Sequence, residues 1–310
     1  MQRFITSATL VLLLVATAAA FAITERLKLT KSALMPGTKV SKVFSPACGC
    51  ARAHANIRVR LRHADNVTVS VIDLRRRDVA LLAAGAGYRR GLARFRWDGR
   101  EPGGKLAPDG AYRIKVHLAR QHQTIVLPNV ILLDTKPPDV QNVVQNREAF
   151  SPDGDKQADF VRFDYTLSKP ARLTLFLGGR RILKTHLHPQ SGKTTWDGHA
   201  RGRLLRPGMY TLEVGALDLA GNSTPPAERR RVHVRIRYIA LAASRLTARA
   251  GKRFEIGVST DALHYRWQLG ARKGRNGGGV LRLQAPDKPG RYVLTVSERG
   301  HVDRARLVVK

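Results

Sequence analysis

Hydrophobic and polar residues alternate along most of the chain, and many of the hydrophobic positions are β-branched. The clearest runs lie at residues 57–62, 67–71, 112–118, 161–167, 173–177, 210–216, 232–238, 254–258 and 265–269. A period of two places one face of a strand in a core and the other face in solvent, as in antiparallel sandwiches. The chain is therefore predicted to be all-β.

A short motif occurs twice and indicates a repeat. Trp-Asp-Gly is followed by a turn and then by a tyrosine that opens an alternating run. We interpret this unit as a structural corner: the tryptophan fills the core, Asp-Gly turns the chain, and the tyrosine hydroxyl bonds to backbone. Stacking of Trp97 or Trp196 on a carbohydrate is the alternative. The corner residues are Trp97, Asp98, Gly99 and Tyr112 in the first copy, and Trp196, Asp197, Gly198 and Tyr210 in the second.

Four motifs in combination point to a known module. Phe-Ser-Pro precedes Trp-Asp-Gly in both copies, and the second copy adds Pro-Gly-x-Tyr (207–210) and Asp-x-Ala-Gly-Asn (218–222). Together they resemble the Ig-like domain of the flagellar hook-capping protein FlgD, over about residues 43–238. The resemblance implies a β-sandwich with an interaction or spacer role. It does not imply hook capping, because the region of FlgD that engages the flagellum has no counterpart in this chain.

The remaining sequence completes a tandem arrangement. Residues 239–310 lack Trp-Asp-Gly but contain Pro-Gly-x-Tyr at 289–292, which predicts a third, smaller Ig-like domain. The predicted parts are an N-terminal segment (1–23), a basic linker (24–42), FlgD-like Ig domains 1 (43–136) and 2 (137–238), and Ig-like domain 3 (239–310).

The N-terminal segment predicts export from a bacterial cell. Residues 4–23 are an apolar run after Arg3, and about 20 apolar residues can span a bilayer as a helix. Ala20-Phe21-Ala22 also fits a signal-peptidase site. A cleaved signal peptide and a retained membrane anchor both stay open, although the basic residues that follow the run disfavour an anchor with an exported C-terminal portion. The expected location is the cell surface or envelope, either membrane-anchored or secreted.

The charge of the chain is strongly positive. Lys and Arg number 55 against 23 Asp and Glu, a formal net charge of +32. One interpretation is an anionic polymer as partner, such as a cell-wall polymer, with nucleic acid less favoured. The other is a genome rich in G and C, which favours arginine codons. The candidate contact strips are the arginines of two alternating runs, Arg58, Arg60, Arg62, Arg235 and Arg237.

An acidic loop follows the second Phe-Ser-Pro. Asp153, Asp155 and Asp159 place several carboxylate oxygens in one short segment, which suits a hard cation such as Ca²⁺. The loop departs from an EF-hand pattern, because Lys156 lies inside it and no glutamate closes it. A turn stabilised by aspartate side chains, without an ion, is the alternative; beyond this Ca²⁺ no cofactor is expected.

The two cysteines occupy the equivalent place in the first copy. Only Cys48 and Cys50 are present, which excludes a disulfide-dense scaffold and a four-cysteine zinc site. In an exported protein we expect them to form a local disulfide, since Cα atoms two residues apart lie within bridging range. A metal clip in which His54 joins the two cysteines is the alternative, and His63 does not make a convincing fourth ligand.

No sequence motif indicates catalysis: Gly-x-Ser-x-Gly and His-Glu-x-x-His are both absent from the 310 residues. We therefore predict a non-enzymatic envelope or surface protein in which Ig-like domains act as interaction or spacer modules. The alternatives are an anionic-polymer-binding protein and the non-catalytic arm of a cell-wall hydrolase complex. The partner, an envelope protein or anionic polymer, is not identified by the sequence.

Overall fold

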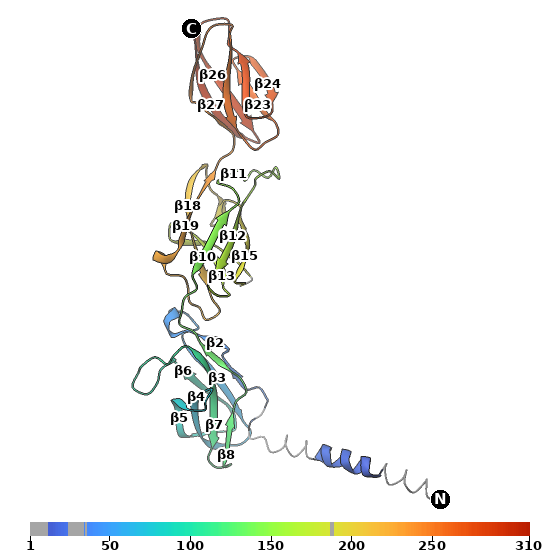
Figure 1. Cartoon of the computed structure of the whole chain (residues 1–310), viewed down its shortest axis with the longest axis vertical. Helices are drawn as coiled ribbons and strands as arrows, with labels where there is room; N and C mark the ends of the chain where they lie inside the picture. Colours follow the sequence, from blue (N-terminus) through green and yellow to red (C-terminus); the bar gives the residue numbers. More distant parts are fainter. Residues whose placement is uncertain (1–11, 24–33, 35, 187–188) are drawn as a thin grey trace, which may run out of the picture. The chain divides into compact units, whose positions relative to one another are not determined.

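The computed structural model describes residues 12–23, 34, 36–186 and 189–310, and its strands confirm the all-β prediction (Figure 1). The chain divides into two compact units, one of residues 1–136 with Leu219–Gly221 and one of residues 137–218 with 222–310. Three separate hydrophobic cores lie within residues 44–133, 140–238 and 239–309. Each core belongs to one sandwich of two sheets, and each predicted domain contains one such core.

The first sandwich begins inside the range expected as a linker. Lys39–Val40 pairs with residues 57–58, and Leu34 bridges Leu61. One sheet has the order β1-β3-β6, and the other the order β2-β9-β7-β4-β5 with β8 paired to β7. The strands are β1 (Lys39–Val40), β2 (Val43–Phe44), β3 (Ala55–Leu61), β4 (Asp65–Asp73), β5 (Asp78–Tyr88), β6 (Gly91–Trp97), β7 (Gly110–Leu118), β8 (Gln123–Val126) and β9 (Ile131–Leu133).

The second sandwich repeats this arrangement. Its sheets have the orders β10-β12-β15 and β11-β19-β18-β13-β14, and β16 and β17 form a small hairpin. The strands are β10 (Val140–Gln145), β11 (Ala149–Phe150), β12 (Val161–Leu167), β13 (Arg172–Leu177), β14 (Arg180–Lys184), β15 (Ser191–Trp196), β16 (His199–Ala200), β17 (Arg203–Leu204), β18 (Gly208–Leu217) and β19 (Arg230–Ile236).

The third sandwich has the same strand orders, although it lacks Trp-Asp-Gly. Its sheets are β20-β22-β25 and β21-β27-β26-β23-β24, and β21 runs parallel to β27 as β2 does to β9 and β11 to β19. The three domains are therefore copies of one Ig-like topology. The strands are β20 (Ala240–Leu241), β21 (Arg245–Ala248), β22 (Arg253–Ser259), β23 (Tyr265–Leu269), β24 (Arg272–Asn276), β25 (Val280–Gln284), β26 (Gly290–Glu298) and β27 (His301–Val309).

The predicted alternation appears directly in the burial of side chains. In β3 every second residue is buried, from Ala55 to Leu61, and Arg58 and Arg60 face solvent. Strand β12 behaves in the same way, with Val161, Phe163 and Tyr165 in the core. The period-two pattern is confirmed as two-sided strands, one face packed and one face solvated.

The N-terminal segment is partly described. Residues 12–23 form a helix with exposed side chains, while residues 4–11 of the apolar run lie outside the described part of the chain. Among the described residues, no helix is both long and apolar enough to cross a membrane.

Candidate functional site

The Trp-Asp-Gly units are structural corners. Trp97 and Trp196 are 1 % and 2 % exposed, and their indole Nε1 atoms donate hydrogen bonds to the backbone oxygens of Arg100 (3.0 Å) and His199 (2.9 Å). The rings therefore lie in the cores and offer no face on which a sugar could stack. Asp98 Oδ1 accepts from the amide of Arg100 at 3.0 Å, and Asp197 Oδ1 from the amide of His199 at 3.2 Å.

The tyrosines that follow each corner also bond to backbone. The hydroxyls of Tyr112 and Tyr210 donate to the carbonyl oxygens four residues earlier, Pro108 O at 2.5 Å and Arg206 O at 2.7 Å. Tyr292 in the third sandwich does the same with Lys288 O at 2.9 Å. The Gly-x-Tyr entry, which proline directly precedes in the second and third sandwiches, is thus a tyrosine corner in all three.

Glycine is required at the two corners for two reasons, the backbone conformation and the lack of room for a side chain. Gly99 and Gly198 have φ of 81° and 80°, a region in which L side chains are strained. A Cβ on Gly99 would lie 2.6 Å from Pro46 Cγ, whereas one on Gly198 would meet its neighbours at 3.2–3.3 Å. Phe-Ser-Pro and Trp-Asp-Gly are therefore parts of one packing unit, because the proline of the first motif covers the glycine of the second.

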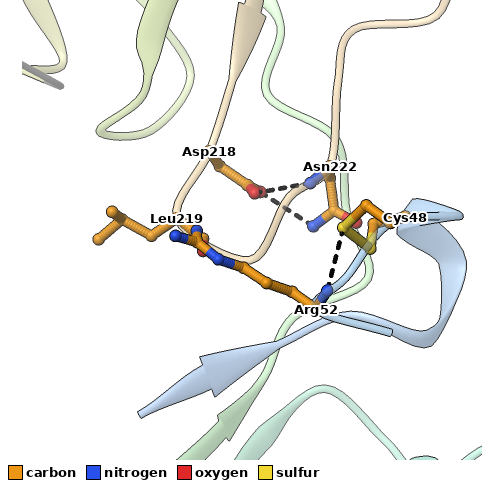
Figure 2. Close-up of a disulfide and its surroundings, with 6 residues drawn as sticks. Cys48, Arg52, Asp218, Leu219 and Asn222 are labelled. Carbon is orange, nitrogen blue, oxygen red and sulfur yellow. Dashed lines mark hydrogen bonds between the residues drawn. A yellow bond between two sulfur atoms is a disulfide. The ribbon is translucent and has the colours of Figure 1, made fainter. Parts of the chain in front are cut away.

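The two cysteines are bonded to one another beside this unit. Cys48 ends a single 3₁₀ turn (Pro46–Cys48), and Gly49 takes a left-handed conformation at φ 56° that brings the two Cα atoms to 5.2 Å. The amide of Arg52 donates to Cys50 Sγ at 3.4 Å (Figure 2). The disulfide engages both sulfurs, so no thiolate is left for a metal clip with His54 and His63.

Loss of this disulfide is expected to have a small effect. A bridge between residues two apart closes a very short loop, so the double variant Cys48→Ser/Cys50→Ser should lower the free energy of unfolding of the first sandwich by about 1.5 kcal/mol. Unfolded, unreduced protein should take up no thiol label, and reduced protein should take up label at two sites. Two labelled sites without reductant would contradict the disulfide.

The acidic loop after β11 is held by its own aspartates. Asp159, one of the three predicted Ca²⁺ ligands, accepts backbone hydrogen bonds with both oxygens, from Gly154 N at 2.7 Å and Lys156 N at 2.8 Å. Asp153 Oδ1 accepts from Asp155 N at 3.1 Å, and Asp155 Oδ1 from Gln157 N at 2.6 Å. These bonds leave one oxygen of Asp153 and one of Asp155 outside the loop's own hydrogen bonding.

In the structure, Asp153 and Asp155 lie together with Glu298 and not with Asp159. The sequence had not indicated Glu298 as a candidate ligand. One ligand atom of each of the three side chains lies within 4.8 Å of the others. Glu298 ends β26 and is 8 % exposed. Burial, then a hydrogen bond with the Asp153 carboxyl, and then the charges of Asp153, Asp155 and Asp261 raise the pKa of Glu298 to about 7. Burial, with the charges of Asp153 and Asp155, also raises the pKa of Asp261.

The predicted arginine strips lie on two different outer faces. Arg58 and Arg60 are exposed on β3, next to Arg94 and Leu92 of β6, and Arg62 is half-buried just beyond the strand. Arg235 is exposed on β19, whereas Arg237 is half-buried after its end. The exposed arginines of each strip lie on the solvated outer face of a sheet.

A groove on the second sandwich gathers arginines more densely than either strip. Its volume is about 1160 Å³. Arg180 and Arg181 come from β14, Arg203 from β17, and Arg201 and Arg206 from the flanking turns. All five side chains are exposed, and none has an acidic partner within 4 Å in the described part of the chain. We call this the arginine groove.

Sequence reasoning missed the groove because its arginines come from separate strands. The local signal was present in two Gly-rich hairpins, Gly178-Gly179-Arg180-Arg181 and Arg201-Gly202-Arg203. Their glycines have φ of 56°, 74° and 71°, so both segments are tight turns that expose the adjacent side chains. A smaller hollow of about 710 Å³ on the third sandwich also carries three arginines, Arg245, Arg291 and Arg306.

Comparison with known proteins gives only distant similarities. No protein-family model and no curated protein sequence matches the chain. A three-domain titin fragment (I67–I69, an E-to-A variant) is 11% identical, covering 88% of this chain and 96% of its own, with a TM-score of 0.31. The fibronectin(III)-like modules of Clostridium thermocellum CbhA are 14% identical, over 64% of this chain and 93% of theirs, with a TM-score of 0.33.

A third similar structure is the SGBP-B protein of a Bacteroides ovatus mixed-linkage glucan utilization locus, determined with a heptasaccharide. It is 13% identical over 89% of this chain and 67% of its own, with a TM-score of 0.23. At such identities and TM-scores we draw nothing about function from any of the three. The fold is a tandem array of Ig-like sandwiches, and the finer resemblance to FlgD stays a prediction.

Proposed function

We propose that the protein is a non-enzymatic, exported bacterial envelope or surface protein whose Ig-like sandwiches act as interaction or spacer modules. The observation that carries this proposal is the threefold use of one sandwich topology, with solvated outer faces rich in arginine. The Cys48–Cys50 disulfide supports export, because such bonds persist in oxidising compartments. The exposed apolar helix at residues 12–23 is in keeping with an N-terminal targeting segment.

Cell fractionation followed by a pull-down tests this proposal. The full chain, with its N-terminal segment intact, should fractionate with the envelope or medium and carry oxidised cysteines. It should also capture the same envelope component from repeated extracts. Recovery of the protein in the cytoplasm with two free thiols would contradict export, and capture of a wall hydrolase would identify the protein as a non-catalytic arm.

We also propose a second function, binding of an anionic polymer through the arginine groove. Five guanidinium groups surround one hollow, and none of them is paired with an acidic side chain among the described residues. Each can contact a phosphate, sulfate or carboxylate group, with which arginine forms bidentate hydrogen bonds. Leu204 and Tyr210 also line the groove, which gives a sugar or ring of the polymer an apolar surface.

Charge reversal in the groove is expected to weaken polymer binding. In the variant Arg180→Glu/Arg201→Glu/Arg203→Glu, retention on heparin should fall, and the slope of log affinity against log salt should decrease by about 3, one for each lost ionic contact. The control is Arg58→Glu/Arg60→Glu/Arg94→Glu, which changes the net charge equally on an open sheet face. Equal losses in both variants would show that only the overall charge matters, and would reject the groove as the site.

A further inference from the structure

Three carboxylates from distant parts of the chain meet at one point. Asp153 and Asp155 belong to the loop after β11, and Glu298 ends β26, more than 140 residues later in the sequence. All three lie in the same compact unit of the chain. Asp261, in the segment between β22 and β23, adds its charge to the same place. The cluster therefore joins the second sandwich to the third sandwich.

Glu298 is a buried carboxylate with one oxygen that no donor reaches. Its side chain is 8 % exposed, and its Oε2 atom is buried without a hydrogen-bond donor, because the group within hydrogen-bond reach of Glu298 is another carboxylate, that of Asp153. Asp153 Oδ2 is likewise buried without a partner. A buried carboxylate oxygen without a donor is costly. The exposed Arg299 forms a salt bridge with the other oxygen of Glu298, with its Nε atom at 3.6 Å. One positive side chain does not balance this group of carboxylates.

The spacing of the oxygens suits a cation at their centre. Oxygens bound to Ca²⁺ lie about 2.3–2.6 Å from the ion, so two ligands on opposite sides are about 5 Å apart. The ligand atoms of Asp153, Asp155 and Glu298 lie within 4.8 Å of one another. The loop is also organised in advance, because Asp159 fixes its backbone and the free oxygens of Asp153 and Asp155 remain for the ion.

We propose that Asp153, Asp155 and Glu298 bind Ca²⁺, and that the ion ties the sandwich of residues 137–238 to that of residues 239–310. Calcium accepts several protein carboxylates at flexible angles, whereas Mg²⁺ demands near-ideal octahedral geometry and keeps most of its water. One further contact crosses the same junction: Tyr238 stacks on His301, with ring centroids 3.5 Å apart. The proposal does not depend on export or on polymer binding.

Calorimetric titration of the full-length, chelator-treated protein with CaCl₂ at pH 8 tests this inference. We expect one Ca²⁺ per chain with a dissociation constant on the order of 10⁻⁴ M, as in extracellular modules. At 5 mM CaCl₂ the thermal transition of residues 137–310 should rise by about 5 °C. An absence of both binding heat and thermal shift would overturn the proposal, and so would equally tight binding of MgCl₂.

Two variants separate ion binding from folding. Glu298→Gln should weaken Ca²⁺ binding at least about tenfold, because it removes one of three charged ligands. Without Ca²⁺ this variant should melt no lower than the parent protein, because it removes an uncompensated buried charge. The control, Glu255→Gln, alters a carboxylate that is 66% exposed and paired with Arg282, and should bind Ca²⁺ normally. Unchanged affinity in Glu298→Gln would reject Glu298 as a ligand.

Discussion

Trp97→Ala is expected to destabilise the first sandwich by about 3–5 kcal/mol, the usual cost of removing a buried tryptophan from a core. The indole is 1 % exposed. It contacts the ring of Tyr112 with centroids 4.9 Å apart and the ring of Phe44 at 5.3 Å. Because a domain is typically stable by only about 5–15 kcal/mol, the loss should lower the midpoint of this sandwich's thermal transition by roughly 15–25 °C.

Hydrogen exchange of the full chain localises the effect. Amides of β3 and β7 should lose protection in Trp97→Ala, while those of β12 and β22 should not, since the three cores are separate clusters. Trp97→Phe keeps an aromatic ring in the core and should cost clearly less. A loss below about 1 kcal/mol for Trp97→Ala would mean that the ring is not a core residue, and would reopen its assignment as a ligand-binding surface.

The strands that the sequence predicted are those with one strongly apolar face. Strands β3, β7 and β12 alternate β-branched or aromatic residues with charged ones, so burial of one face determines their structure. Strand β5, residues 78–88, contains Leu81-Leu82-Ala83-Ala84-Gly85-Ala86-Gly87 and gives no period of two. It is an edge strand with register shifts against β4. Its pairing is therefore determined by β4 and not by an alternation of apolar and polar residues in β5 itself.

The candidate sites show where a single sequence stops being informative. Asp153, Asp155 and Asp159 are close in sequence, and local reasoning grouped them as ligands. The fold assigns Asp159 to the loop backbone and supplies Glu298 from β26 in its place. The sequence around Glu298 does not distinguish it from a glutamate on the surface. Its burial comes from packing between segments that lie far apart in the chain. Long-range placement of this kind depends on the whole topology.

Asp65 gives the second large expected effect, because it is a buried carboxylate that organises a turn. It starts β4, is 1 % exposed, and accepts from Arg120 N at 2.8 Å and Gln121 Nε2 at 2.9 Å. These two donors lie in the turn between β7 and β8. In Asp65→Ala both donors lose their acceptor inside the protein, at an expected cost of about 1–3 kcal/mol. Thermal unfolding of the full chain, with exchange at residues 119–122, measures the loss.

Asp65→Asn is the matched control and isolates the charge. Its amide oxygen can still accept from Arg120, while the side chain no longer titrates. Burial raises the pKa of Asp65, but the hydrogen bonds from Arg120 and Gln121 outweigh it, so the pKa is lowered from 3.8. Because the folded pKa lies below the unfolded one, the contribution of the charge is complete above the unfolded pKa and is lost as pH falls through the folded pKa.

The stability difference between the parent protein and Asp65→Asn should therefore be largest at neutral pH and shrink as the pH falls from about 5 towards 2. The difference in stability between the two proteins cancels the titration of the other carboxylates. Asp73 is one of these: hydrogen bonds with Arg77 outweigh its desolvation, so its pKa is also lowered. A difference that stays constant over this range would mean that the Asp65 charge contributes nothing to the fold. The turn at 119–122 would then be held by packing alone.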